Sequence, residues 1–162
     1  MIIKQIRDED FTSYKKPSMV IGFPTCNWKC EKECGIKGLC QNSSLASAPD
    51  IHINKCDIVN RYLTNPITKS IIMAGLEPFD SWESLSDLIV EFRKHTNDDI
   101  VIYTGYKKEE ISYAIDWLTL FPNIIVKFGR FIPNQEPHYD EVLGIKLASN
   151  NQYAEELKYN EI

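Results

Sequence analysis

The chain has 162 residues, of which 43% are apolar and 25% are charged, enough for one domain with a hydrophobic core and too few for two. Its net charge of −5 argues against a nucleic-acid partner, because a sequence-independent binder presents a basic surface. The sequence has no apolar run of the roughly 18 residues that a membrane span needs, and its first residues lack a secretory signal, so we expect a cytoplasmic protein without a membrane partner.

Apolar runs and helical periodicity predict an alternation of strands and helices along the chain. The first strand covers residues 18–23, and the cysteine-rich segment after it is predicted to be a loop. The elements that follow are a helix over 54–63, a strand over 70–74, a helix over 82–95, a strand over 99–103, a helix over 109–120, a strand over 123–128 and a candidate strand over 143–147. Cys56 lies on the apolar stripe of the first helix and is assigned to the core.

Strands of continuous apolar residues that alternate with helices indicate a parallel sheet covered by helices. A closed eight-unit barrel needs about 250 residues, so we expect an α/β fold with an open partial (βα) barrel of about five or six mainly parallel strands. We expect a single domain over residues 1–162, with the polar tail from about residue 153 as a candidate flexible segment.

Ligands of such sheets bind at the carboxyl ends of the strands. Four segments follow predicted strands: the cysteine segment, GLEP at 75–78, TGYK at 104–107 and GRFIPN at 129–134. These segments are therefore predicted to converge on one site.

Four of the five cysteines lie close together, at Cys26, Cys30, Cys34 and Cys40. In a reducing compartment such a cluster indicates metal or redox chemistry rather than disulfides. The spacing lacks the C-x2-C pairs of structural zinc sites, although a zinc-stabilised, non-catalytic interaction module held by all four cysteines stays an alternative. The other interpretation is a [4Fe–4S] cluster held by three cysteines, which leaves one iron open to a ligand and one cysteine spare.

Six short motifs occur in order along nearly the whole chain: CNWKC at 26–30, CQN at 40–42, GLEP at 75–78, YTGY at 103–106, FGRF at 128–131 and SNNQ at 149–152. With these motifs the sequence resembles the radical S-adenosylmethionine enzymes, and among them the activating proteins of the anaerobic (class III) ribonucleotide reductase. The resemblance implies a radical-type partial barrel, a [4Fe–4S] cluster and S-adenosylmethionine as cofactors.

The resemblance also implies an activity. An electron from the reduced cluster cleaves S-adenosylmethionine, and the resulting 5′-deoxyadenosyl radical takes a hydrogen atom from a glycine of a large glycyl-radical enzyme. Anaerobic ribonucleotide reductase is the expected protein substrate, with another glycyl-radical enzyme or a peptide as the alternative. A reductant such as flavodoxin or ferredoxin is the expected electron donor.

The sequence departs from the family's C-x3-C-x2-C spacing, because Glu33 stands where the third cysteine is expected. Cys26 and Cys30 match the first two ligands. The resemblance favours Cys40 as the third, since Asn42 follows it as in the family and Leu39 precedes it where the family packs an apolar residue on the adenine. Cys34 stays the alternative third ligand.

A second departure is GLEP in place of the family's GGEP. The resemblance implies that Gly75, Leu76, Glu77 and Pro78 form the turn that receives the amino group of S-adenosylmethionine. Leu76 must then avoid a positive φ or carry strain of about 1–3 kcal/mol. Thr104 and Gly105, at the end of the next strand, are expected to line the same cofactor.

Overall fold

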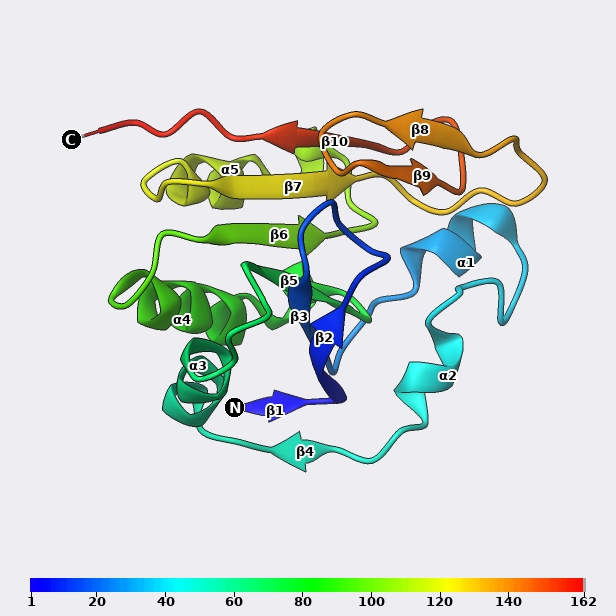
Figure 1. The fold of residues 1–162 in the computed structure, drawn as a ribbon. Helices are drawn as coiled ribbons and strands as arrows, with labels where there is room; N and C mark the ends of the chain where they lie inside the picture. The colour runs from blue at the N-terminus through cyan, green and yellow to red at the C-terminus, as the bar shows by residue number, and fades with distance from the viewer. Residues whose placement is uncertain (162) are drawn as a thin grey trace.

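In the computed structural model, which describes residues 1–161, six strands form the central sheet in the order β10-β7-β6-β5-β3-β2 (Figure 1). The bounds are β2 Gln5–Asp10, β3 Ser18–Phe23, β5 Ser70–Gly75, β6 Asp99–Tyr103, β7 Ile124–Phe128 and β10 Tyr153–Glu156. The four central strands are parallel, and the edge strands β2 and β10 are antiparallel to their neighbours. The α/β class with a mostly parallel sheet is therefore confirmed, and the sheet is open at β2 and β10.

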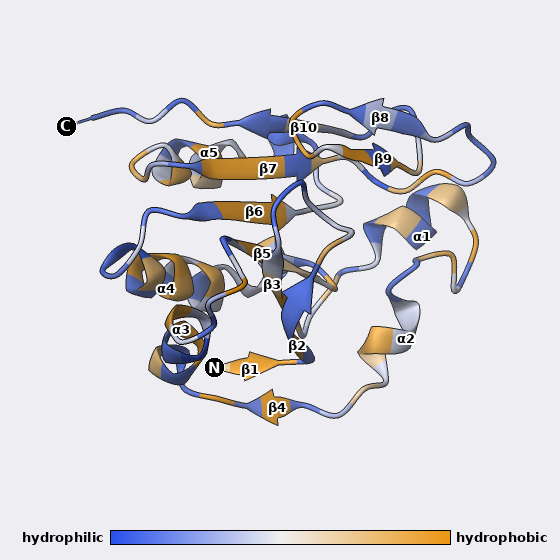
Figure 2. Cartoon of the chain, viewed as in Figure 1, coloured by the Kyte–Doolittle hydropathy of each residue, from blue (hydrophilic) through white to orange (hydrophobic). Residues whose placement is uncertain are grey.

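The central strands are buried because both faces of the sheet are covered. β3 and β7 are buried along their whole length, as their continuous apolar residues predict. Figure 2 shows the contrast between the hydrophobic β6 and β7 and the hydrophilic edge strand β2.

Three helices, α3 Lys55–Leu63, α4 Trp82–Arg93 and α5 Ser112–Leu118, cross between the parallel strands and cover one face. The short 3-10 helices η1 Pro78–Ser81 and η2 Lys108–Ile111 lead into α4 and α5. The helix predicted over 82–95 is confirmed as α4, and the four residues of its apolar stripe, Leu85, Leu88, Ile89 and Phe92, have no exposed surface.

The opposite face of the sheet carries a second, smaller core. Here Tyr14, Leu143 and Leu147 pack against side chains of the central strands. Two small antiparallel sheets complete the fold: β1 Ile2–Ile3 with β4 Ile51–His52, and β8 His138–Asp140 with β9 Ile145–Leu147. The candidate strand over 143–147 thus exists as β9, but it belongs to a hairpin outside the central sheet.

Residues 153–156 of the predicted tail form β10 beside β7, and Leu157 after them is buried. Other predictions were wrong in part. The cysteine segment contains two short helices, α1 Lys29–Cys34 and α2 Ser43–Ala46, and the helix predicted over 109–120 is shorter than expected. Cys56 is exposed, because the buried face of α3 is formed by Ile58, Val59 and Tyr62, and Cys56 lies in the first turn of the helix, outside this face.

Candidate metal centre

A cavity of about 410 Å³ lies at the carboxyl ends of the parallel strands. All four segments predicted to converge contribute to its wall: the cysteine segment, the GLEP turn, the TGYK turn and residues after β7. In Figure 1 the arrowheads of β6 and β7 point toward α1, which carries part of the cysteine segment. The convergence follows from the topology, since parallel strands end at the same edge of a sheet.

Three of the four clustered cysteines, Cys26, Cys30 and Cys40, line this cavity, and Cys34 is not among its lining residues. Cys34 ends α1, and Gly35 then takes a left-handed conformation with φ 70°. Gly38, with φ 72°, continues the turn toward Cys40. The two glycines therefore supply the unusual backbone angles that return the chain to the cavity.

Hydrogen bonds shape the cysteine segment and tie it to the end of β5. The backbone N–H of Trp28 donates to Cys26 Sγ at 3.3 Å, with Trp28 itself at φ 59°. Asn42, in the CQN motif, donates to the carbonyl oxygen of Gly75 at 2.8 Å and so ties this motif to the GLEP turn.

The GLEP turn depends on glycine at its first position only. Gly75 has φ 97°, and a Cβ there would lie 2.6 Å from both Gly22 Cα and Phe23 N. Leu76 is not among the residues with positive φ, so it replaces glycine without that strain. Pro78 is buried as the first residue of η1, and neither it nor the half-buried Leu39 lines the cavity.

Glu77 is the acidic side chain of the cavity wall and is only 5% exposed. Its carboxylate accepts hydrogen bonds from Thr104 Oγ1 at 2.8 Å, from Gly105 N at 2.9 Å and from Phe79 N at 3.2 Å. Burial raises the pKa of Glu77 to about 7, and these hydrogen bonds oppose the rise. Glu77 thus joins the end of β5 to the end of β6.

Glycine at position 105 leaves room beside the cysteines. A Cβ there would lie 3.3 Å from Cys30 Sγ and 3.7 Å from Glu77 Oε2. Gly75, Leu76, Glu77, Thr104 and Gly105 all line the cavity, so the structure brings these expected residues together with the three cysteines.

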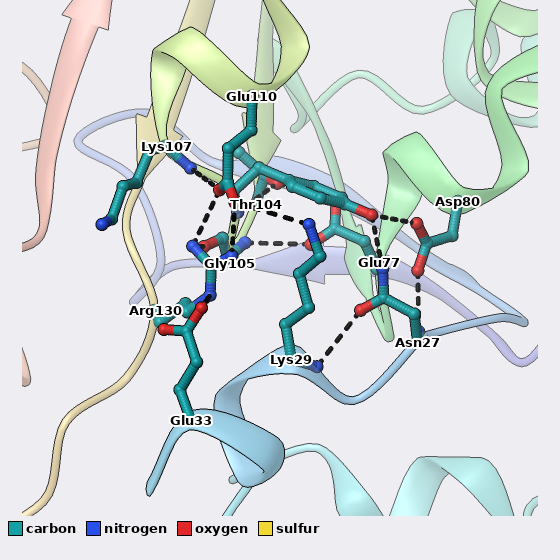
Figure 3. Close-up of polar contacts among 11 residues, drawn as sticks. Asn27, Lys29, Glu33, Glu77, Asp80, Thr104, Gly105, Lys107, Glu110 and Arg130 are labelled. Atoms are coloured by element: carbon teal, nitrogen blue, oxygen red, sulfur yellow. Dashed lines mark hydrogen bonds and ion pairs between the residues drawn. The ribbon is translucent and has the colours of Figure 1, made fainter.

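A polar network anchors α1 to the turns around it (Figure 3). Arg130, only 5% exposed, donates two hydrogen bonds to Glu110 at 2.8 and 2.7 Å and one to the carbonyl oxygen of Gly105 at 3.3 Å. Its Nε also lies 3.0 Å from Glu33 Oε1, on α1. The hydrogen bond to Arg130 is the main cause that lowers the pKa of Glu110 to about 2.

A second branch of this network holds the beginning of the cysteine segment. Asp80 accepts from the backbone N–H of Asn27 at 2.8 Å and from the hydroxyl of Tyr106 at 2.5 Å. The side-chain amide of Asn27 donates to the Tyr106 hydroxyl at 2.6 Å. The side chain of Lys29 lies over the Tyr106 ring, with Nζ 4.6 Å from its centroid.

Sequence reasoning missed two buried cations of the site, Lys127 and Arg130. Lys127 lines the cavity, is 7% exposed and donates to the carbonyl oxygen of Gly129 at 3.0 Å. Burial lowers its pKa to about 8. A lysine inside the apolar strand IIVKF, and an arginine just after it, were the available indications in the sequence.

The fold and site together define a mixed α/β protein that brings three cysteines to one cavity at the carboxyl ends of parallel strands. Residues 19–153 match the family model described as a 4Fe-4S single cluster domain. The chain therefore belongs to this family of iron–sulfur proteins. No curated protein and no solved structure matches the chain. Within residues 1–161, the helices are too short or too polar to cross a membrane.

The donor set of the cavity fits an iron–sulfur cluster. Burial raises the pKa of the Cys26 thiol to about 11 and also raises that of Cys30, so a bound cation must hold these groups as thiolates. In the described part of the chain, no group of three His, Cys, Asp or Glu side chains is placed to hold a single metal ion.

Proposed function

We propose that this protein is a [4Fe–4S]-dependent radical S-adenosylmethionine enzyme that generates a glycyl radical on anaerobic ribonucleotide reductase. Cys26, Cys30 and Cys40 are the proposed cluster ligands. Membership of the 4Fe-4S single cluster family supports the cluster, and the motif order along the chain supports the reaction.

One observation carries the proposal. The cysteine segment, the GLEP turn and the TGYK turn follow the consecutive parallel strands β3, β5 and β6, and they border one cavity. A catalytic cluster needs space for a second ligand beside its cysteines. The cavity supplies that space, because it continues past the cysteines across the sheet to Arg7 and Lys146.

The residues of the chain have separate roles in this proposal. The three cysteines hold the cluster, which supplies the electron for cleavage of S-adenosylmethionine when bound. Glu77 fixes the GLEP turn against Gly105, so that residues 75–77 line the cavity in which the cofactor would bind. Thr104 supports Glu77 from the end of β6.

Anaerobic reconstitution tests the cluster and the reaction separately. The protein is expected to bind about four irons and four sulfides per chain. With S-adenosylmethionine and dithionite it is expected to release methionine and 5′-deoxyadenosine, and the Cys30→Ser variant is the inactive control. A protein that holds the cluster but releases no 5′-deoxyadenosine would be an electron carrier, and one that holds only zinc would be a structural module.

The partner is tested by electron paramagnetic resonance. The reconstituted protein is incubated with S-adenosylmethionine, a reductant and a purified anaerobic ribonucleotide reductase. A glycyl radical on the reductase supports the assignment, and replacing dithionite with flavodoxin or ferredoxin tests the electron donor. Cofactor cleavage without a radical on the reductase, but with one on another glycyl-radical enzyme or a peptide, would reassign the substrate.

A further inference from the structure

Lys127 is a buried cation that forms no ion pair within residues 1–161, although Cys30 and Glu77, which line the same cavity, attract its charge from beyond ion-pair distance. It lies on β7, on the same sheet face as Val20 and Ile72, and the three side chains line the cavity. Its ammonium group donates to a single backbone carbonyl, that of Gly129. Within residues 1–161, the carboxylates that form ion pairs do so with other basic residues, and none of them pairs with Lys127.

The other buried cation of the site differs in this respect. Arg130 is paired with Glu33 and Glu110, so its charge is offset by two carboxylates. A buried charge without such a partner costs folding free energy, because the protein interior solvates it poorly. The attraction of Glu77 and Cys30 across the cavity offsets only part of this cost, so Lys127 destabilises the protein unless a stronger anion occupies the cavity.

The anion that the proposed function places in this cavity is the cysteine-bound centre. Three thiolates outweigh the charge of an oxidised [4Fe–4S]²⁺ core, so the centre as a whole is negative. One electron from an external low-potential donor makes it more negative. A fixed positive charge nearby stabilises the reduced form more than the oxidised form, and net charge is one of the factors that set the potential of such clusters.

We propose that Lys127 is the internal counter-charge of the cysteine-bound cluster and raises its reduction potential. This inference rests on the proposed ligands Cys26, Cys30 and Cys40. Lys127 is a positioning residue in this role, because it acts on the electrostatics of the site and not on the substrate. Its location in the same cavity wall as Cys30 and Cys26 gives it this effect without a direct bond to the cluster.

A redox titration of the reconstituted protein, without S-adenosylmethionine, tests the inference. The Lys127→Met variant keeps the length of the side chain and removes the charge. We expect its equilibrium constant for one-electron reduction to fall at least tenfold, which is a shift of about 59 mV to a more negative potential. Lys127→Arg, which keeps the charge, is expected to stay much closer to the native potential.

The matched control is Lys69→Met, which removes the same charge from an exposed residue just before β5, at the opposite end of the strand from the cavity. We expect no shift in its potential. A potential in Lys127→Met that equals that of the native protein or of Lys69→Met would overturn the inference. A native protein that binds no iron–sulfur cluster would instead overturn the proposed function.

A second measurement uses the protein without its cluster. Lys127→Met removes the unpaired buried charge, so the apo variant is expected to unfold at a higher denaturant concentration than the native apo protein. Loss of stability in this variant contradicts the inference. If Lys127→Met folds but loses the cluster, retention by Lys127→Arg supports a charge effect, and loss from both variants overturns it.

Discussion

Gly75 and Leu76 have different backbone conformations in the GLEP turn. Gly75 takes the left-handed conformation and the close approach to the backbone of Gly22, whereas Leu76 has an ordinary backbone. The second glycine of a GGEP motif is therefore dispensable for the path of this turn. From the sequence alone, Leu76 could either avoid a positive φ or carry strain. The φ angles of the structure show that it avoids a positive φ.

Substitution of Gly75 tests this difference. Gly75→Ala adds a Cβ that would lie 2.6 Å from two backbone atoms, and we expect it to lower the free energy of unfolding by at least about 3 kcal/mol. Gly38→Ala is the control, because Gly38 has φ 72° but no atom within 4 Å of the added Cβ. Its cost should be only that of the left-handed conformation, about 1–2 kcal/mol. Equal losses in urea titrations of the two variants would contradict the assigned clash.

Cys34 and Cys40 are equivalent by residue type and differ by placement. Cys40 lines the cavity, and Cys34 lies at the end of α1 outside its lining. The cysteine spacing alone allowed either residue as the third ligand, because the loop between them has no periodicity that fixes its path.

Iron and sulfide content tests which of Cys34 and Cys40 is the third cluster ligand. We expect Cys34→Ser to hold as much iron and sulfide after anaerobic reconstitution as the native protein, and Cys40→Ser to lose most of both. The reason is that only Cys40 reaches the cavity with Cys26 and Cys30. Equal damage in the two variants would favour a site that uses all four cysteines, such as zinc.

Among the elements, α1 depends most on contacts outside its own residues. It has six residues, none of them buried, so neither length nor apolar packing stabilises it. Arg130 links it through Glu33 to the turn after β6. Sequence patterns predicted a loop here because the segment lacks an apolar stripe and contains two glycines.

Removal of Arg130 tests this link. We expect Arg130→Met to speed hydrogen exchange of the α1 amides and to lower the free energy of unfolding by about 1–3 kcal/mol, because it removes the hydrogen bonds of a buried guanidinium to Glu110 and its contact to Glu33. Lys29→Met is the control on the same helix, with a side chain that is 40% exposed and a weaker contact to Glu110 at 3.4 Å. Its expected cost is about 0–1 kcal/mol. Exchange that is unchanged in Arg130→Met would show that α1 does not depend on this anchor.

At the scale of the whole molecule, the cysteine segment lies outside both hydrophobic cores. The cores join the central sheet to α3, α4 and α5 on one face and to Tyr14, Leu143 and Leu147 on the other. Neither α1 nor α2 contributes a buried residue. The cavity wall therefore has a rigid side formed by strand ends and a weakly packed side formed by the cysteine segment.

Removal of the cluster is expected to affect these two sides differently. After chelation, amides of residues 24–48 should lose protection from hydrogen exchange, while those of β5 and β6 keep theirs, because local opening follows local packing. Far-UV circular dichroism should change little. A uniform loss of protection through β5 and β6 would instead show that the cluster is required for the whole fold.

The sequence by itself determined the central strands and the class of site. Continuous apolar runs correctly predicted the strands β3, β5, β6 and β7, because both faces of these strands are buried. The polar edge strands β2 and β10 escaped prediction, since an edge strand obtains its stability from one neighbour and not from its own pattern. Clustered cysteines indicated metal chemistry through their density alone, and the family match bears out the [4Fe–4S] assignment.

Only the tertiary structure decided which groups meet. It placed Cys40 and not Cys34 at the cavity, enclosed Glu77 among donors from β6, and buried Lys127 and Arg130 at the end of β7. These relations join residues far apart in the chain, and a charge acquires its partners and its burial only when the strands come together. For that reason the sequence indicated a cluster, and the fold was needed to show the charges around its site.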